Sequence, residues 1–165
     1  MRQMKMVVIS AAVAIAGVIN GAVAYGQSPV LRHVMDIRAE ISGAYNGGKA
    51  PHGERVVIPI TGGEVTGDVK GKIIPGGVDY QLVDGGRARG ELCAIYSIMT
   101  EDSTLINVRN EGINCWGEGN QYFMTSPRFE CNVDSKYGWL NDRIFVCRPV
   151  GFEPGAIVLR VWAVE

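Results

Sequence analysis

The chain has 165 residues, of which 16 are basic and 17 are acidic. Two basic residues and no acidic residue lie in the first 26 positions, so the rest carries a net charge of 14 − 17 = −3. This balance, without any alternation of basic and aromatic residues, excludes a nucleic-acid-binding surface. The 22 glycines are typical of a turn-rich β protein rather than a helical one.

The first 26 residues have the pattern of a secretory signal peptide. Arg2 and Lys5 form a charged start, an apolar run of 14 residues follows, and Ala24 and Gly26 offer small residues for cleavage. The run is shorter than the ~20 residues that a bilayer span needs, which favours cleavage after Ala24 or Gly26 over an uncleaved membrane anchor. We therefore expect a secreted or periplasmic domain of residues 27–165 that has no attachment to the membrane.

An even number of cysteines in an exported chain favours disulfides. Four cysteines allow three pairings, and we favour Cys115 with Cys147, because both fall toward one end of the expected sheet and Cys115 lies in an expected loop. The alternative is four buried free thiols. No CxxC motif or adjacent histidine pair is present, so no metal site is expected. The candidate disulfide cysteines are Cys93, Cys115, Cys131 and Cys147.

The first expected strand covers residues 31–41, where apolar and polar side chains alternate with period two. Its more apolar face includes His33, which we expect to be half-buried or hydrogen-bonded rather than a metal ligand. Residues 43–53 contain Gly, Asn and Pro and predict a loop. Residues 55–61 predict a second strand, in which Pro59 indicates an edge position or a bulge.

The third expected strand starts at residue 67 and continues past a bulge at Gly76-Gly77 to Val83. Asp84-Gly-Gly then predicts a hairpin turn. The remaining expected strands cover residues 88–99, 104–110, 122–131, 142–148 and 156–164.

This pattern gives eight to nine strands joined by short connections, with no helix after residue 26. Short connections make neighbouring strands antiparallel, and eight such strands can close on themselves and remove their edges. The sequence therefore predicts an all-β fold, an up-and-down barrel of the calycin type. A β-sandwich is the second choice.

Four motifs, which together span most of the chain after residue 50, resemble the DUF3237 family, also called UPF0311. They are GERVVIPITGG at residues 53–63, GKIIPGGVDYQ at 71–81, NVRNEG at 107–112, and RFE with YGWLN between 128 and 141. The resemblance implies a lipocalin-like β-barrel, but it implies no established reaction and no cofactor. Typical members look cytoplasmic and poor in cysteine, so this chain would be an exported member.

No nucleophile elbow, zinc-protease motif or phosphate-binding glycine loop occurs. The candidate ligand-binding residues are polar or aromatic residues in the apolar, glycine-punctuated strands and the turn of these motifs. Burial of a polar group without a partner would cost about 2–7 kcal/mol, so we expect them to converge at one barrel mouth. They are Asp79, Arg109, Arg128, Glu130, Trp139 and Asn141.

A structural role remains open for each candidate. Arg128 and Glu130, two positions apart on one strand, could form a surface ion pair that contributes little. Asp79 could stabilise the glycine bulge, and Trp139 and Asn141 could form a packed corner. A left-handed backbone at Asn141 would fit such a corner.

Three functions remain open for a barrel of this kind. The first is binding of a small, partly apolar ligand in the barrel mouth, which needs an apolar cavity with one or two polar groups. The second is a cofactor-independent isomerase, cyclase or hydrolase that uses Asp79 or Glu130 with Arg109 or Arg128. Such an enzyme needs two nearby titratable groups with perturbed pKa values. The third is a structural domain with a filled interior. The lack of a reaction-specific motif favours binding.

Overall fold

The computed structural model of the protein describes residues 28–165. The expected signal peptide over residues 1–26 lies outside them. Within the described residues, nine antiparallel strands form one sheet in the order β1-β9-β8-β7-β6-β5-β4-β3-β2, and β1 also pairs with β3. That pairing closes eight strands into a barrel and leaves β2 on the outer edge of β3. The predicted antiparallel barrel is confirmed.

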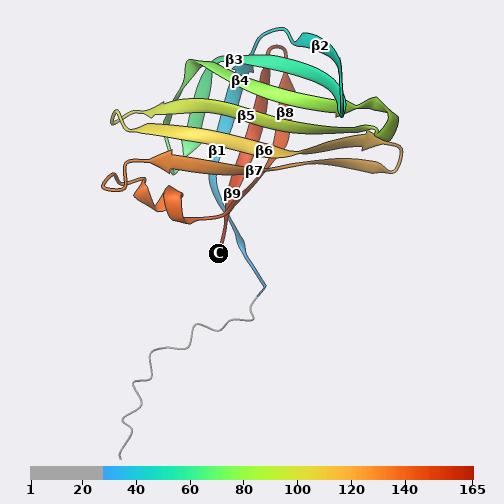
Figure 1. Ribbon diagram of the computed structural model, residues 1–165. Coiled ribbons are helices and arrows are strands. Elements are labelled where there is room, and N and C mark those ends of the chain that lie inside the picture. Colours follow the sequence, from blue (N-terminus) through green and yellow to red (C-terminus); the bar gives the residue numbers. More distant parts are fainter. Residues whose placement is uncertain (1–27) are drawn as a thin grey trace, which may run out of the picture.

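Consecutive strands are joined by short connections, as predicted, except β7 and β8, between which residues 132–144 form a longer connection that contains η2. Figure 1 shows β3 to β7 side by side across one side of the barrel, with β1, β8 and β9 crossing behind them. The elements are β1 (Leu31–Ile41), β2 (Tyr45–Ala50), β3 (Gly53–Gly67), β4 (Gly71–Asp84), the 3₁₀ helix η1 (Gly85–Arg87), β5 (Arg89–Thr100), β6 (Leu105–Gly117), β7 (Asn120–Cys131), the 3₁₀ helix η2 (Gly138–Asp142), β8 (Phe145–Glu153) and β9 (Ala156–Val164).

Several segments differ from the sequence-based expectation. No helix was expected after residue 26, but η1 and η2 are short 3₁₀ helices, and β8 begins at Phe145 rather than at residue 142. β6 extends to Gly117, so Cys115 lies in a strand and not in the expected loop.

The expected loop over residues 43–53 contains β2, which forms because its backbone pairs with the first half of β3. The strand expected over residues 55–61 continues to Gly67, because the glycine pair at 62 and 63 bends β3, with a register shift between Ile60 and Glu64. Gly63 has a φ of +137°, and an added Cβ there would collide with the carbonyl of Arg38. The bend lets one long strand pair with both β1 and β2.

The bulge predicted at Gly76-Gly77 is confirmed by a register shift between Ile74 and Val78 in the pairing of β4 with β5. Gly76 has a φ of +112°, which favours glycine. The bulge adds two residues to β4, so the inward face stays the same, but the register moves by two positions and the inward-facing Asp79 is opposite Ala94.

One half of the interior is densely packed with apolar side chains, and this is the main core of the domain. Phe129 and Phe145 meet edge to face there, with ring centroids 4.9 Å apart. The most deeply buried large side chains include Met35, Ile98, Ile106, Leu140 and Phe145. The other half lies toward the β4–β5, β6–β7 and β8–β9 connections, and it contains the interior cavity described below.

The barrel wall is weakest between β7 and β8, where only Thr125 and Cys147 are paired. Beyond this point side chains replace the missing ladder. Ser126 Oγ donates a hydrogen bond to the Phe145 carbonyl at 2.9 Å. We call this junction the β7–β8 seam.

The four cysteines are free thiols, so the expected disulfide is not present. The favoured Cys115–Cys147 pair does not fit the strand register. Cys147 is opposite Thr125, which is opposite Gly112, three residues along β6 from Cys115. Three residues span roughly 10 Å along a strand, whereas the Cα atoms of a disulfide lie about 4.4–6.8 Å apart.

Candidate functional site

The unfilled half of the barrel holds a cavity of about 320 Å³, to which each of the eight barrel strands contributes. Most of its wall is apolar, with Ile58, Leu92, Phe123 and Leu159 among the lining residues. A cavity of this size and lining is typical of a small-molecule site.

The strand register explains why space remains at this level. Asp79 on β4, Ala94 on β5 and Asn110 on β6 form one row across the wall. Ala94 in the middle of that row is small, so the volume in front of it stays open. In the next row Gly112 is opposite Thr125, and a Cβ on Gly112 would collide with the Thr125 side chain and the neighbouring backbone.

Four buried side-chain oxygens in residues 28–165 have no hydrogen-bond partner. They are Asp79 Oδ1, Tyr96 Oη, Asn110 Oδ1 and Thr125 Oγ1, and all four residues line this one cavity. Tyr96, Asn110 and Thr125 are each no more than 5% exposed. An unpaired buried polar group costs about 1–3 kcal/mol, so this concentration of unpaired groups marks the cavity as a site for a polar guest.

Burial controls the protonation of these groups. It raises the pKa of Asp79, although the Gln81 side-chain amide, which donates to Asp79 Oδ2 at 2.7 Å, and the Cys93 backbone amide favour the ionised form. Burial also raises the pKa of Tyr96, so its hydroxyl stays protonated. The Cys147 thiol, at the same level, has its pKa raised to about 11 by burial. Tyr96, Asn110 and Thr125 therefore present neutral donors and acceptors, and burial shifts Asp79 toward its protonated form.

The Cys147 thiol lies near Thr125 and Asn110, and both favour its ionised form slightly. These contacts are not hydrogen bonds by geometry, so Thr125 Oγ1 and Asn110 Oδ1 remain without a partner. The arrangement can bind a neutral group in the gap between Asp79 and Asn110. Asp79 could also give a proton to such a group or take one from it.

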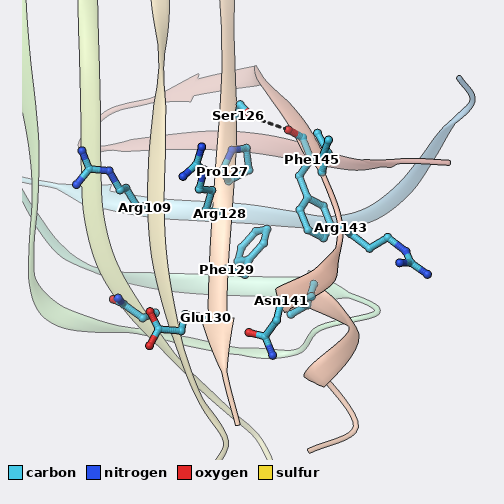
Figure 2. A pocket seen from close by; sticks show the side chains of 12 residues that line it. Arg109, Ser126, Pro127, Arg128, Phe129, Glu130, Asn141, Arg143 and Phe145 are labelled. Carbon is cyan, nitrogen blue, oxygen red and sulfur yellow. Dashed lines mark hydrogen bonds between the residues drawn. The ribbon is translucent and has the colours of Figure 1, made fainter. Parts of the chain in front are cut away.

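Four of the predicted site residues line a different depression, on the outside of the barrel. This outer groove has a volume of about 660 Å³, and its predicted members are Arg109, Arg128, Glu130 and Asn141. Arg109 and Arg128 are directly opposite each other on β6 and β7, and their side chains lie side by side in Figure 2. Arg109 is engaged by Glu111, with an Nη2–Oε1 distance of 2.6 Å. Asp79 is thus separated from the predicted arginines by the barrel wall.

Asn141 is held by backbone groups at the open edge of β7. Its Oδ1 accepts a hydrogen bond from the Cys131 N–H at 3.0 Å. Its Nδ2 donates to the carbonyls of Cys131 at 3.2 Å and Gly138 at 2.9 Å. The side chain thus supplies the hydrogen bonds that a neighbouring strand would supply. The left-handed backbone considered for Asn141 is not present.

Trp139, the sixth predicted residue, packs against the core and does not line the cavity. Its ring centroid is 6.0 Å from that of Phe145. The guanidinium carbon of Arg32 lies 5.5 Å from the ring centroid on the exposed side. These contacts fasten η2 and its flanking turn to the barrel.

Tyr96, Asn110 and Thr125 were not predicted as site residues. The available signal was their phase, because Asn110 lies on the same face of β6 as Ile106 and Val108, which are fully buried. Charged Arg109, one position away, interrupts the apolar pattern more visibly but points outward. His33, expected to be half-buried or hydrogen-bonded, is exposed and contacts Asp36 at 2.9 Å, so the hydrogen-bonded alternative is the one confirmed.

In the part of the chain that the structure describes, no helix is long and apolar enough to cross a membrane. Residues 28–165 also contain no group of three or more His, Cys, Asp and Glu side chains placed to hold a metal ion.

Comparison with known proteins identifies the family. Residues 29–164 match the family described as "Protein of unknown function (DUF3237)". A UPF0311 protein of Bradyrhizobium diazoefficiens is 37% identical over 129 residues, which cover 70% of this chain and 84% of that protein.

Solved structures agree with this assignment. A protein of unknown function from Clostridium acetobutylicum superposes with a TM-score of 0.76 at 29% identity, covering 84% of this chain and 99% of that one. A protein from Penicillium herquei, described as an enzyme, has a TM-score of 0.69 over 84% of this chain and 96% of its own. At 21% identity it shows a shared fold alone. The chain belongs to the DUF3237 (UPF0311) family of β-barrel proteins.

Proposed function

We propose that the protein binds a small, partly apolar molecule inside the barrel. The observation that carries this proposal is the convergence of four unpartnered buried oxygens on one cavity. A barrel that served only as a scaffold would gain stability from apolar side chains at these positions. Groups that lower stability but line a common cavity are typical of binding sites, where the ligand completes their hydrogen bonds.

The cavity indicates the chemistry of the ligand portion that it holds. A volume of about 320 Å³ lies at the lower end of the small-molecule range. The largely apolar wall suits an aliphatic or aromatic skeleton. Asp79, Tyr96 and Asn110 suit a hydroxyl or carbonyl group on that skeleton. Because no arginine or lysine of residues 28–165 lines the cavity, an anionic group there would lack a counter-ion.

Catalysis is the second candidate, and a specific observation supports it. Asp79 and Tyr96 are titratable, line the same cavity, and both have their pKa raised mainly by burial. A protonated carboxyl group in an apolar cavity can act as a general acid, and its ionised form as a base. This arrangement suits an isomerisation or cyclisation that needs proton transfer and no cofactor.

Fluorescence titration with N-phenyl-1-naphthylamine, a neutral aromatic amine, tests the binding proposal. We expect saturable binding of one probe per chain. Replacement of Ala94 by Leu places a larger apolar side chain between Asp79 and Asn110, so the affinity should fall tenfold or more while the barrel stays folded. The matched control, Arg128→Gln in the outer groove, should bind as the wild type does. Unchanged affinity in folded Ala94→Leu would overturn the proposal.

We also propose that the domain acts outside the cytoplasm. The support is the pattern of the first 26 residues, with two basic residues before an apolar run and small residues at the cleavage positions.

A further inference from the structure

A second groove leads out of the cavity on the side of the β7–β8 seam. This seam groove has a volume of about 430 Å³ and lies where β7 and β8 pair only at Thr125 and Cys147. Asn114, Phe123 and Phe152 line both the cavity and the seam groove. The two volumes are therefore neighbours, and the seam groove is where a ligand longer than the cavity would continue.

Aromatic side chains form much of the seam groove. Trp116 is 44% exposed, Tyr122 is 52% exposed and Phe152 is 73% exposed. A cluster of exposed large apolar side chains around a cavity is typical of a binding surface, whereas single exposed apolar residues are common on any protein. Their flat faces suit the continuation of an apolar or aromatic skeleton.

Arg148 is the one charged residue among the described residues that line the seam groove. It is opposite Arg160, whose guanidinium is held by both oxygens of Asp36 at 2.9 Å. No carboxylate of residues 28–165 lies within ion-pair distance of Arg148. Glu153, at the cavity mouth, is already paired with Arg38 at 2.9 Å. A guanidinium beside aromatic rings is thus left without an anion.

We propose that the ligand extends from the cavity into the seam groove and ends there in an acidic group bound by Arg148. The inference rests on the proposed function and names the class of molecule. Its neutral polar end lies between Asp79 and Asn110, its apolar body crosses Phe123 and Phe152, and its outer end is an oxyacid. Guanidinium groups bind carboxylate, sulfonate or phosphate oxygens through paired N–H donors, which gives both strength and orientation.

Two probes that differ by one acidic group test this inference. N-phenyl-2-naphthylamine is neutral, and 6-anilinonaphthalene-2-sulfonate has the same rings with a sulfonate at the opposite end of the naphthalene from the amine. We expect Arg148→Gln to weaken sulfonate binding about tenfold at low ionic strength, which corresponds to ~1.4 kcal/mol, and to leave neutral binding within twofold. Phe152→Ala should weaken both probes. Arg143→Gln, an arginine of the outer groove, is the matched control and should change neither.

The outcomes separate this inference from the proposed function. Suppose that Ala94→Leu weakens binding of the neutral probe but Arg148→Gln does not change binding of the sulfonate probe. The cavity then binds ligands, and the inference that the ligand ends in an acidic group bound by Arg148 is wrong. A loss of sulfonate binding in Arg128→Gln instead would place the anion in the outer groove and would also overturn the inference. If neither probe responds to folded Ala94→Leu, the proposed function fails. Circular dichroism of each variant establishes that it is folded.

Discussion

Asp79 and Asn110 lie on either side of Ala94 in one row that crosses β4, β5 and β6. Each has a buried oxygen without a hydrogen-bond partner, and the small side chain between them leaves a gap. Asp79 reaches this row because the Gly76-Gly77 bulge shifts the register of β4 against β5 by two residues. A backbone irregularity in one strand thus places a carboxyl group opposite an amide across an empty volume.

Two buried threonines provide a direct test of the unsatisfied cavity. Thr100 Oγ1 hydrogen-bonds Asp102 and both backbone groups of Thr104, whereas Thr125 Oγ1 has no partner. We expect Thr100→Val to lower the free energy of unfolding by about 1–3 kcal/mol. Thr125→Val should be neutral or stabilising, because it removes a buried polar group that has no partner. Urea denaturation of both variants measures this, and an equal loss in both would contradict the site.

The raised pKa of Asp79 predicts a pH-dependent effect on stability. The folded state holds this proton more tightly than the unfolded state, whose pKa is near 3.8. The contribution of Asp79 to stability therefore falls as pH rises from the unfolded to the folded pKa, and stays constant above that. Asp79→Asn removes this loss, so the variant should gain stability over the wild type as pH rises.

Denaturant unfolding at several pH values measures the difference between Asp79→Asn and the wild type. Taking this difference removes the shared contributions of Asp36 and Asp102, whose pKa values are lowered and which therefore act in the opposite direction. A difference that shrank with rising pH would show that the Asp79 pKa is not raised.

Asn141 should prove structural rather than ligand-binding. Its side chain makes three hydrogen bonds to the backbone of Cys131 and Gly138. Asn141→Ala should therefore lower the free energy of unfolding by about 1–3 kcal/mol, while probe binding in the cavity stays unchanged. Arg128→Gln, on the same groove but exposed, should change stability little. Calorimetry and the probe titration together measure both properties, and weakened probe binding in a folded Asn141→Ala would contradict this role.

Export predicts a shortened N-terminus. Protein recovered from the periplasm or medium of an expressing bacterium should begin at Tyr25 or Gln27, because cleavage follows Ala24 or Gly26. Intact-mass analysis measures the N-terminus and the number of free thiols in one experiment. Recovery of the domain only from the cytoplasm, with Met1 retained, would show that the segment does not direct export.

The sequence predicted much of the fold because local patterns determine it. The bounds of β1 and β9 and the bulge at Gly76-Gly77 follow from alternation and from glycine pairs. β2 could not be predicted in this way, since residues such as Gly47 and Gly48 have low strand propensity, and the segment is extended only through pairing with β3.

The candidate site was harder to predict because it depends on which face each residue takes. Arg109 and Asn110 are neighbours, and the two-residue period of a strand sends one outward and the other into the cavity. The charged Arg109 interrupts the apolar pattern of β6 more visibly, but the buried amide of Asn110 is the residue that lines the cavity. The role of Asn141 depends on where β7 loses its partner strand, which is a property of the closed barrel and not of the local sequence.

A crystal structure of the protein with N-phenyl-1-naphthylamine tests the central claim most directly. The account predicts the probe inside the barrel, with its rings against Leu92 and Phe123 and its amine within hydrogen-bond distance of Asp79 or Asn110. Density for the probe in the outer groove beside Arg128, with the interior cavity free of it, would contradict the claim that the barrel interior is the binding site.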